Sequence, residues 1–391
     1  MKRKFETIAI RTQLEKSQYQ EHSIPLYLTS SYAFQSAEEG AALFSGVSDG
    51  YMYSRVSNPN SDDFAIKLAL LEGAEAGIAT ASGMSAIFST FAALLKSGDH
   101  IIASKSIFGS SHHVIENILP DWGIEYSFVN IKDEAAWNKA FKQHTKLVFL
   151  ESPANPTLDL IDMQWLANLC HQNDALLVVD NCFATPYLQQ PVSLGADIVV
   201  HSATKFLDGQ GRVMGGAILS SKKIIEKCHS FIQKSGPTLS PFNSWMLSKS
   251  LETLAVRMDR HCDNALALAT YLESHPEIEQ VRYPFLPSFE QYELAKRQMN
   301  KGGGLVSCII KGGVERGRKF LNSLELHSLT ANLGDTRSIA THPASTTHSK
   351  LSSAQQEEVG IIPGLLRFSV GLEHIDDIIA DVEQALTKSK L

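Results

Sequence analysis

Short apolar segments alternate with segments of helical spacing over much of the chain, and this alternation limits the folds that the sequence can adopt. The apolar segments, rich in β-branched residues, are 76–81, 101–103, 126–129, 147–150, 176–179 and 198–200. Segments with apolar residues at helical spacing separate them, for example 135–141 and 165–170. This order is typical of βαβ units, so the sequence predicts an α/β fold with a mostly parallel sheet and helices on both faces.

A second, smaller α/β unit is expected nearer the end of the chain. Its strands and helices are predicted at 305–310, 314–321, 366–370 and 375–386. Because the first residues carry little regular pattern, we expect them to form an arm on a neighbouring subunit, the alternative being a loop packed on its own domain. The predicted division is an N-terminal arm (1–57), an α/β domain (58–253) and a C-terminal α/β domain (254–391).

Polar residues follow the predicted strands of the first unit. In parallel sheets a ligand binds beyond the carboxyl ends of the strands, so these residues are candidates for a site. They are Ser82-Gly83-Met84, Phe108-Gly109-Ser110, Glu151 to Pro156, Asp180-Asn181 and His201 to Lys205.

Lys205 is the candidate with the strongest chemistry. It follows the apolar segment 198–200 and precedes a glycine-rich segment, so its ammonium is delivered by a buried strand into a polar bend. Two roles are open at this point. The amine could be desolvated, with a lowered pKa that suits covalent chemistry, or it could be a point charge that binds phosphate.

Two other strand ends complement this lysine. Gly83 and Met84 open a predicted helix, whose free N–H groups suit a phosphate, although many α/β loops carry Ser-Gly without a ligand. Asp180 ends a buried segment and needs a partner or a cap, because an unpaired buried carboxylate is costly. A phosphate site, a lone carboxylate and a desolvated lysine together fit pyridoxal 5′-phosphate.

The sequence resembles the cystathionine γ-synthase family, the Cys/Met-metabolism group of fold type I pyridoxal-phosphate enzymes. The resemblance runs from about residue 7 to 388 and rests on motifs that occur in the family's order. These are Tyr53-Ser54-Arg55, Ser82-Gly83-Met84, Glu151-Ser152-Pro153-Ala154-Asn155-Pro156, Asp180-Asn181, Ser202-Ala203-Thr204-Lys205 and Arg367-Phe368-Ser369-Val370-Gly371.

The resemblance implies a role for each matching residue in cofactor binding. Lys205 would hold the cofactor as a Schiff base, Asp180 would pair with its pyridinium and Asn155 would bond its ring hydroxyl. Its phosphate would be held by the Ser202 and Thr204 hydroxyls, the Gly83 and Met84 amides, and Tyr53 and Arg55 of a neighbouring subunit.

The same resemblance places the substrate on two residues of the C-terminal unit. Arg367 would bind the substrate α-carboxylate through two parallel hydrogen bonds, aided by Ser338. For each residue the alternative is a solvated or structural contact.

Two positions depart from other members of the family. Phe108 stands where many members have a tyrosine that stacks on the cofactor. Phenylalanine can stack but cannot carry protons, so acid–base work would fall on Lys205 or on Tyr53. Ser110 stands where methionine γ-lyases typically carry a reactive cysteine, which argues against a lyase.

Within the family, segments 108–110, 208–213 and 334–338 most resemble the O-succinylhomoserine sulfhydrylases. We therefore expect a γ-replacement in methionine biosynthesis in which sulfide displaces succinate from O-succinylhomoserine and homocysteine forms. Cystathionine γ-synthase, O-acetylhomoserine sulfhydrylase and, less favoured, methionine γ-lyase remain alternatives. A catalytically silent cofactor-binding protein is a different class, and the retention of Lys205 and Arg367 argues against it.

Composition excludes other classes of partner. A net charge of -7 argues against a general nucleic-acid or membrane surface, and no apolar stretch of about 18 residues occurs. The first residues lack the pattern of a signal peptide, so we expect a cytoplasmic protein. The five scattered cysteines indicate reduced thiols, no metal site is expected, and the resemblance implies a homotetramer.

Overall fold

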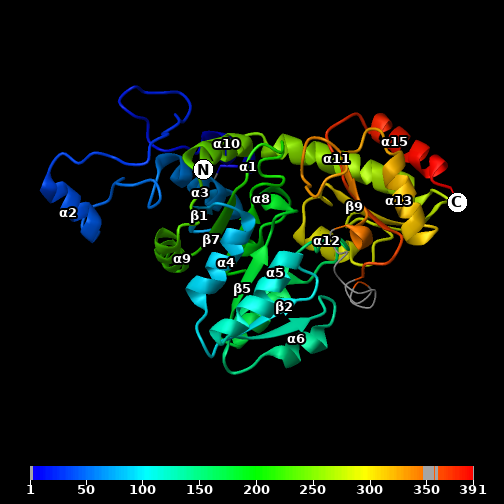
Figure 1. Ribbon diagram of the computed structural model, residues 1–391, viewed down its shortest axis with the longest axis horizontal. Helices are drawn as coiled ribbons and strands as arrows, with labels where there is room; N and C mark the ends of the chain where they lie inside the picture. The colour runs from blue at the N-terminus through cyan, green and yellow to red at the C-terminus, as the bar shows by residue number, and fades with distance from the viewer. Residues whose placement is uncertain (1–2, 347–355, 357–359, 391) are drawn as a thin grey trace.

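The computed structural model describes residues 3–346, 356 and 360–390, and its larger sheet has seven strands (Figure 1). Their order across the sheet is β1-β7-β6-β5-β4-β2-β3. In chain order they are β1 (Ala76–Thr80), β2 (His100–Ser104), β3 (Glu125–Val129), β4 (Thr145–Glu151), β5 (Leu176–Asp180), β6 (Ile198–Ser202) and β7 (Gly216–Ser220). All neighbours are parallel except that β7 runs antiparallel to β1 and β6. The predicted α/β fold with a mostly parallel sheet is confirmed.

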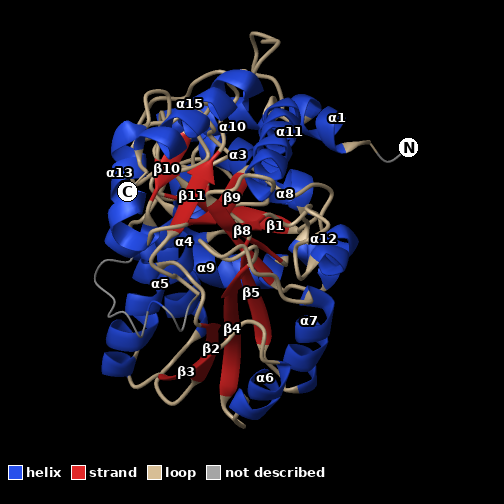
Figure 2. Ribbon diagram, turned by 90° about the vertical axis from the view of Figure 1, so that its right-hand side faces the viewer, coloured by secondary structure: helices blue, strands red, loops and turns tan. Residues whose placement is uncertain are grey.

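Successive side chains of the central strands enter two different cores, which explains the unbroken apolar segments. In β4, Leu147 and Phe149 face one core, while Val148 and Leu150 face the other. The first core is covered by α4 (Gly83–Leu94) and α9 (Lys222–Ser235), the second by α3 (Pro59–Glu72), α6 (Glu134–Ala140) and α7 (Met163–Gln172). Figure 2 shows strands β2, β4 and β5 between α6 and α7 on one side and α5 (Gly109–His113) on the other.

A four-stranded antiparallel sheet forms the smaller unit, in the order β10-β11-β9-β8. Its strands are β8 (Ile278–Arg282), β9 (Leu305–Ile310), β10 (Ile339–Thr341) and β11 (Leu365–Ser369). One face packs on α11 (Leu254–Glu273), α13 (Gly313–Ser323) and α15 (Ile375–Lys388). Helices α8 (Thr185–Leu188), α10 (Pro241–Leu251) and α12 (Tyr292–Gln298) also belong to the described part of the chain. The strands and helices expected in this part of the sequence are present, while the domain boundary at 253/254 stays a prediction.

The N-terminal residues are more regular than expected, since they contain α1 (Phe5–Arg11) and α2 (Ala37–Ser45). Helix α1 lies against α3 and buries Ala9. The chain segments before and after α2 run antiparallel, with an isolated β-bridge between Ser31 and Tyr53. Figure 1 shows α2 extending away from the body of the molecule, so we call this part of the chain the arm. Both helices are short, and α1 is too short to give a periodic pattern that could be recognised.

The arm is attached to the start of α3 by Asn58, which is fully buried. Its side-chain nitrogen donates to the Tyr27 carbonyl, the Tyr32 hydroxyl and the Ser54 hydroxyl, each at 3.1 Å. Several apolar side chains beyond this anchor are exposed to solvent: Leu28 is 70% exposed, Phe44 75% and Val47 82%. An arm with this much exposed apolar surface in one chain fits contact with another molecule.

All five cysteines are buried and free of disulfide bonds. Within residues 3–346, 356 and 360–390, no three histidine, cysteine, aspartate or glutamate side chains are grouped so that they could hold a metal ion. None of the helices in these same ranges has both the length and the apolar character that crossing a membrane requires.

Candidate active site

Lys205 lies in the turn that follows β6, as the sequence predicts. Its amide donates to the Ser202 carbonyl at 3.2 Å, and its own carbonyl accepts from the Gly209 amide at 2.8 Å. The side chain is partly buried, and this burial lowers the pKa of the Lys205 amine. Its Nζ donates to Asn332 Oδ1 at 2.8 Å. The amine is therefore desolvated and oriented, which the first of its two possible roles requires.

The start of α4 lies directly against the end of β6. A Cβ on Gly83 would come within 2.5 Å of the Ser202 Cβ, so a glycine is needed for this close approach. Ser82 caps the helix by accepting from the Ser85 amide. The amides of Gly83 and Met84 have no partner within the described chain, which is the usual state of a helix start. Together with Ser202 they form a cradle suited to a phosphate.

Thr204, the other predicted phosphate ligand, makes different contacts in this chain. Its hydroxyl accepts from the Gly215 amide at 3.2 Å and donates to the Gly215 carbonyl at 3.4 Å. Both bonds are long, and they brace the turn of Lys205 against the segment leading to β7. The role of Thr204 toward phosphate stays a prediction.

Two buried carboxyl groups lie side by side at the ends of neighbouring strands. Asp180 on β5 pairs in register with Glu151 on β4, and burial raises the pKa of Asp180 to about 6. Burial, followed by the nearby charge of Asp180, raises the pKa of Glu151 well above its ordinary value. Asp180 Oδ1 accepts from the Cys182 amide at 3.1 Å. A cationic ring nitrogen placed at Asp180 would give this carboxylate the partner that it lacks.

Glu151 also connects two predicted cofactor residues. Its Oε2 accepts from the Phe108 amide at 3.2 Å, and its Oε1 accepts from the Asn155 amide at 3.1 Å. The sequence contains Glu151 in a family motif, but its local pattern does not indicate this role, because Phe108 lies far from it in the sequence. The Phe108 side chain is 49% exposed, so its ring face is open to a planar partner.

Arg367 on β11 is nearly fully buried and incompletely paired. Its Nη1 donates to Asn155 Oδ1 at 2.9 Å, while its Nε and Nη2 have no partner among the described residues. Burial lowers the pKa of Arg367 to about 10. Two unpaired N–H groups on one guanidinium match the geometry of a carboxylate, so the side chain fits the predicted substrate role.

Ser338 makes contacts of its own in this chain, and its role toward the substrate stays a prediction. Its hydroxyl donates to Glu373 Oε2 at 2.9 Å and accepts from the Gly371 amide at 2.9 Å. Since the single hydroxyl proton goes to Glu373, Ser338 offers no side-chain donor to a carboxylate in this arrangement. Its contacts instead brace the segment that follows Arg367.

Tyr53 and Arg55 lie on the arm and are not gathered with the others. Arg55 Nη1 donates to the Gln233 carbonyl on α9, and its guanidinium lies 5.6 Å from the centre of the Tyr53 ring. Within the described chain neither contacts Lys205, Ser202 or the start of α4. Their predicted contact with a cofactor phosphate would therefore be made in a neighbouring subunit.

Asn332 is the contact of Lys205 that the sequence analysis missed. It lies between α13 and β10 in a segment without helical or strand periodicity, and its partner is distant in the sequence. The free amides at Gly83 and Met84, the unpaired nitrogens of Arg367 and the desolvated Lys205 fit a phosphorylated aldehyde cofactor and an amino-acid substrate.

Comparison with known proteins agrees with this arrangement. Residues 6–387 match the family described as Cys/Met metabolism PLP-dependent enzyme. An O-succinylhomoserine sulfhydrylase from Pseudomonas aeruginosa is 46% identical over 98% of this chain and 95% of its own. An L-methionine gamma-lyase from Fusobacterium nucleatum is 42% identical over 98% of both chains.

A solved structure shares the fold over nearly its whole length. It is a putative O-acetylhomoserine (thiol)-lyase from Campylobacter jejuni with N′-pyridoxyl-lysine-5′-monophosphate at its position 205. It superposes with a TM-score of 0.94 and 35% identity, covering 98% of this chain and 99% of the other. The chain is thus a pyridoxal-phosphate-dependent enzyme, and it belongs to the Cys/Met metabolism PLP-dependent family.

Proposed function

We propose that this enzyme catalyses a γ-replacement in which sulfide displaces succinate from O-succinylhomoserine and homocysteine is formed. The observation that supports an amino-acid substrate is the buried guanidinium of Arg367, whose Nε and Nη2 are unpaired among the described residues. The choice of reaction is supported by the likeness to the Pseudomonas sulfhydrylase and by segments 108–110, 208–213 and 334–338.

A chain of hydrogen bonds connects Arg367, the predicted substrate-binding residue, to Phe108, the residue predicted to stack on the cofactor ring. Arg367 donates to the Asn155 side chain, the Asn155 amide donates to Glu151, and Glu151 also accepts from the Phe108 amide. The carboxylate of a bound substrate would therefore be fixed relative to the face on which Phe108 stacks. Such orientation is worth a large part of the rate in reactions of this kind.

Pyridoxal phosphate, when bound, supplies an electron sink for the carbanion that forms at the substrate α-carbon. Lys205 Nζ is the group placed to take the α-proton, because its lowered pKa leaves more of the amine uncharged near neutral pH. Asp180 would supply negative charge to the ring nitrogen. At the γ-carbon the C–O bond to succinate breaks and a C–S bond to hydrosulfide forms, so the ester oxygen leaves with its electron pair.

Methionine γ-lysis is the second candidate, and the likeness to the Fusobacterium lyase favours it. Both reactions use the same anchor and the same base, so the residues of Lys205's turn cannot separate them. Ser110 argues against the lyase, since methionine γ-lyases typically carry a reactive cysteine at this position. It lies exposed in α5, next but one to Phe108.

The test offers the purified holoenzyme O-succinylhomoserine or O-acetylhomoserine, each with sulfide or with cysteine, and methionine alone. Homocysteine from the succinyl ester and sulfide, at the highest kcat/KM of the set, is the expected result. Cystathionine as the main product would overturn the choice of nucleophile, and faster turnover of the acetyl ester would overturn the choice of ester. Ammonia and 2-oxobutanoate from methionine as the main products would assign the lyase.

We further propose a homotetramer built from dimers that share active sites, located in the cytoplasm. The support for sharing is that Arg55, stacked on Tyr53, donates to the Gln233 carbonyl on α9 and not to the turn of Lys205 in the same chain. Sedimentation of the purified protein tests the assembly.

A further inference from the structure

The turn that carries Lys205 ends with two backbone carbonyls that accept from no backbone amide of the described residues. Inside the turn, the Asp208 amide donates to the Ala203 carbonyl at 2.9 Å, and the Gly209 amide donates to the Lys205 carbonyl. The carbonyls of Phe206 and Leu207 are left over. Because both residues are buried, these oxygens need a donor from elsewhere in the molecule.

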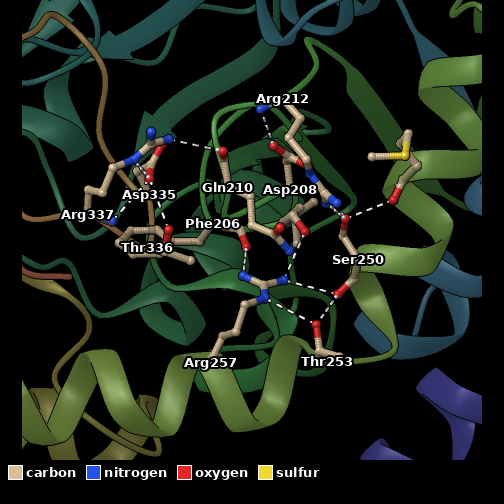
Figure 3. Close-up of polar contacts among 12 residues, drawn as sticks. Phe206, Asp208, Gln210, Arg212, Ser250, Thr253, Arg257, Asp335, Thr336 and Arg337 are labelled. Carbon is tan, nitrogen blue, oxygen red and sulfur yellow. Dashed lines mark hydrogen bonds and ion pairs between the residues drawn. The ribbon is translucent and has the colours of Figure 1, made fainter. Parts of the chain in front are cut away.

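The donor is Arg257 on α11, which is only 6% exposed (Figure 3). Its Nη1 donates to the Phe206 carbonyl at 2.6 Å, and its Nη2 donates to the Leu207 carbonyl at 3.1 Å. The same Nη2 reaches the Ser250 carbonyl at 3.0 Å, and Nε reaches the Thr253 hydroxyl at 3.3 Å. A single guanidinium thus closes the end of the lysine's turn and joins it to the junction of α10 and α11.

The turn and the guanidinium approach each other so closely that no side chain fits between them. Gly209 has a φ of 69°, and a Cβ there would lie 2.0 Å from Arg257 Nη1. Only glycine combines this left-handed conformation with this approach. The contact therefore depends on a glycine in the turn as well as on the guanidinium of Arg257.

On its other side the turn is held by the segment that precedes β10. A Cβ on Gly334 would lie 2.6 Å from the Phe206 amide nitrogen, so this segment also touches the turn. Arg337, paired with Asp335, donates to the Gln210 carbonyl at 3.3 Å (Figure 3). Asn332 of the same segment accepts from Lys205 Nζ. The turn therefore lies between α11 and the segment before β10, and β10 belongs to the sheet that contains Arg367.

We propose that Arg257 is a positioning residue for catalysis: it fixes the turn of Lys205 relative to the sheet that carries Arg367. It touches neither substrate nor cofactor, and it acts through the two carbonyls next to the lysine. Only the choice of substrate in its test rests on the proposed function. Lysine cannot replace it, since a compact ammonium lacks the planar fork that reaches three carbonyls at once.

Arg316 on α13 supplies a matched control. It is 5% exposed, donates to the Lys311 and Leu386 carbonyls at 3.3 and 3.4 Å, and forms an ion pair with Glu277 at 2.6 Å. Removing either guanidinium breaks hydrogen bonds from a buried arginine to backbone carbonyls, but only Arg257 bonds to the turn of Lys205. The variants are Arg257→Lys, Arg257→Met and Arg316→Met, each prepared as holoenzyme.

Three measurements separate positioning from stability: the midpoint of thermal unfolding, the pH midpoint of the absorbance band of the lysine-linked cofactor, and kcat with KM. We expect both Arg257 variants to lose about tenfold or more in kcat, with KM changed less than about threefold, because a small displacement of a reacting group is costly. The pH midpoint of the band should move by about half a unit or more. Arg316→Met should unfold at a lower temperature and keep the other values.

The proposal is overturned if folded Arg257→Met or Arg257→Lys keeps kcat within about twofold, or if Arg316→Met changes the band and kcat equally. Should Arg257→Met not fold, Arg257→Lys and Gly209→Ala decide, since the latter pushes the guanidinium from the turn while leaving it in the chain. The absorbance measurement needs no substrate. A failure of the proposed γ-replacement would therefore leave this part of the result intact.

Discussion

At the scale of single residues, the burial of Lys205 sets its chemistry. Burial lowers the pKa of its amine, and the first prediction concerns the variant Lys205→Ala. Turnover should fall below detection, and the absorbance band of the lysine-linked cofactor should disappear, because no other side chain in the site carries an amine. Spectra and product formation measure this, and residual turnover above about one-thousandth of the wild-type rate contradicts the role.

Lys67 provides the control for this variant. It is another buried lysine, 1% exposed on α3, with a pKa lowered by burial, and it donates to the Ser248 hydroxyl at 2.8 Å. Lys67→Met should change the free energy of unfolding and leave the absorbance band in place. If Lys67→Met also removed the band, loss of the band would report on folding rather than on the anchor.

Arg367 carries the second prediction. Arg367→Lys should raise KM about tenfold or more, since a charge-assisted hydrogen bond to a carboxylate is worth roughly 1.5–3 kcal/mol and lysine cannot form two in parallel. Initial rates over a range of substrate concentrations give kcat and KM separately. If only kcat fell, the guanidinium would act in the transition state and not on the bound substrate.

Arg282→Lys is the control for Arg367→Lys. Arg282 on β8 and Arg367 on β11 pair in register with the same residue of β9, Ser307, from opposite sides. Arg282 is more exposed than Arg367. Its replacement should leave KM unchanged, which would attribute the rise in KM to the unpaired nitrogens of Arg367.

At the scale of helices and strands, the sequence could predict the elements that a local pattern specifies. It could not predict the features that depend on contacts between residues far apart in the sequence. Strands β1 to β6 were predicted because each contains a short, mostly apolar segment. The lysine's turn and the Asp180 carboxylate were predicted because they directly follow those strands. The antiparallel direction of β7 and the contact between Lys205 and Asn332 depend on pairing across the fold, which no local pattern specifies.

The third prediction concerns the attachment of α15 to the smaller unit. Asp381 on α15 accepts from the amides of Glu325 and His327 at 2.8 and 3.0 Å and from the His327 ring at 2.7 Å. Although burial opposes it, these hydrogen bonds, led by that of His327, lower the pKa of Asp381. Asp381→Asn should reduce the free energy of unfolding by about 1–3 kcal/mol near neutral pH.

The effect of Asp381→Asn should depend on pH in one direction. An aspartate whose pKa is lowered by folding stabilises the folded state above its unfolded pKa, near 3.8, and this contribution is lost as the pH falls below that value. Urea unfolding at about pH 7 and about pH 3.5 should therefore show a smaller difference between variant and wild type at the lower pH. An equal difference at both values would contradict the account.

At the scale of the whole molecule, the site is assembled from parts that lie far apart in the sequence. Asp180 lies on the seven-stranded sheet and Lys205 in the turn after β6. Arg367 lies on the four-stranded sheet, and Asn332 lies in the segment that precedes β10. The arm contributes nothing to this assembly within the described chain, because Arg55 bonds to Gln233 on α9 instead. Its exposed apolar residues and the anchor at Asn58 suit a segment that is held out toward another subunit.

The fourth prediction tests whether Arg55 completes the site of a neighbouring subunit. Arg55→Ala and Lys205→Ala proteins, each inactive or nearly so alone, are unfolded together and refolded as a mixture. In a hybrid dimer that exchanges arms, one site carries both defects and the other carries none. Random pairing makes about half of the dimers hybrids, so about a quarter of the wild-type activity should return. If Arg55 served the site of its own chain, every site would keep one defect, and the mixture would stay at the sum of the two inactive proteins.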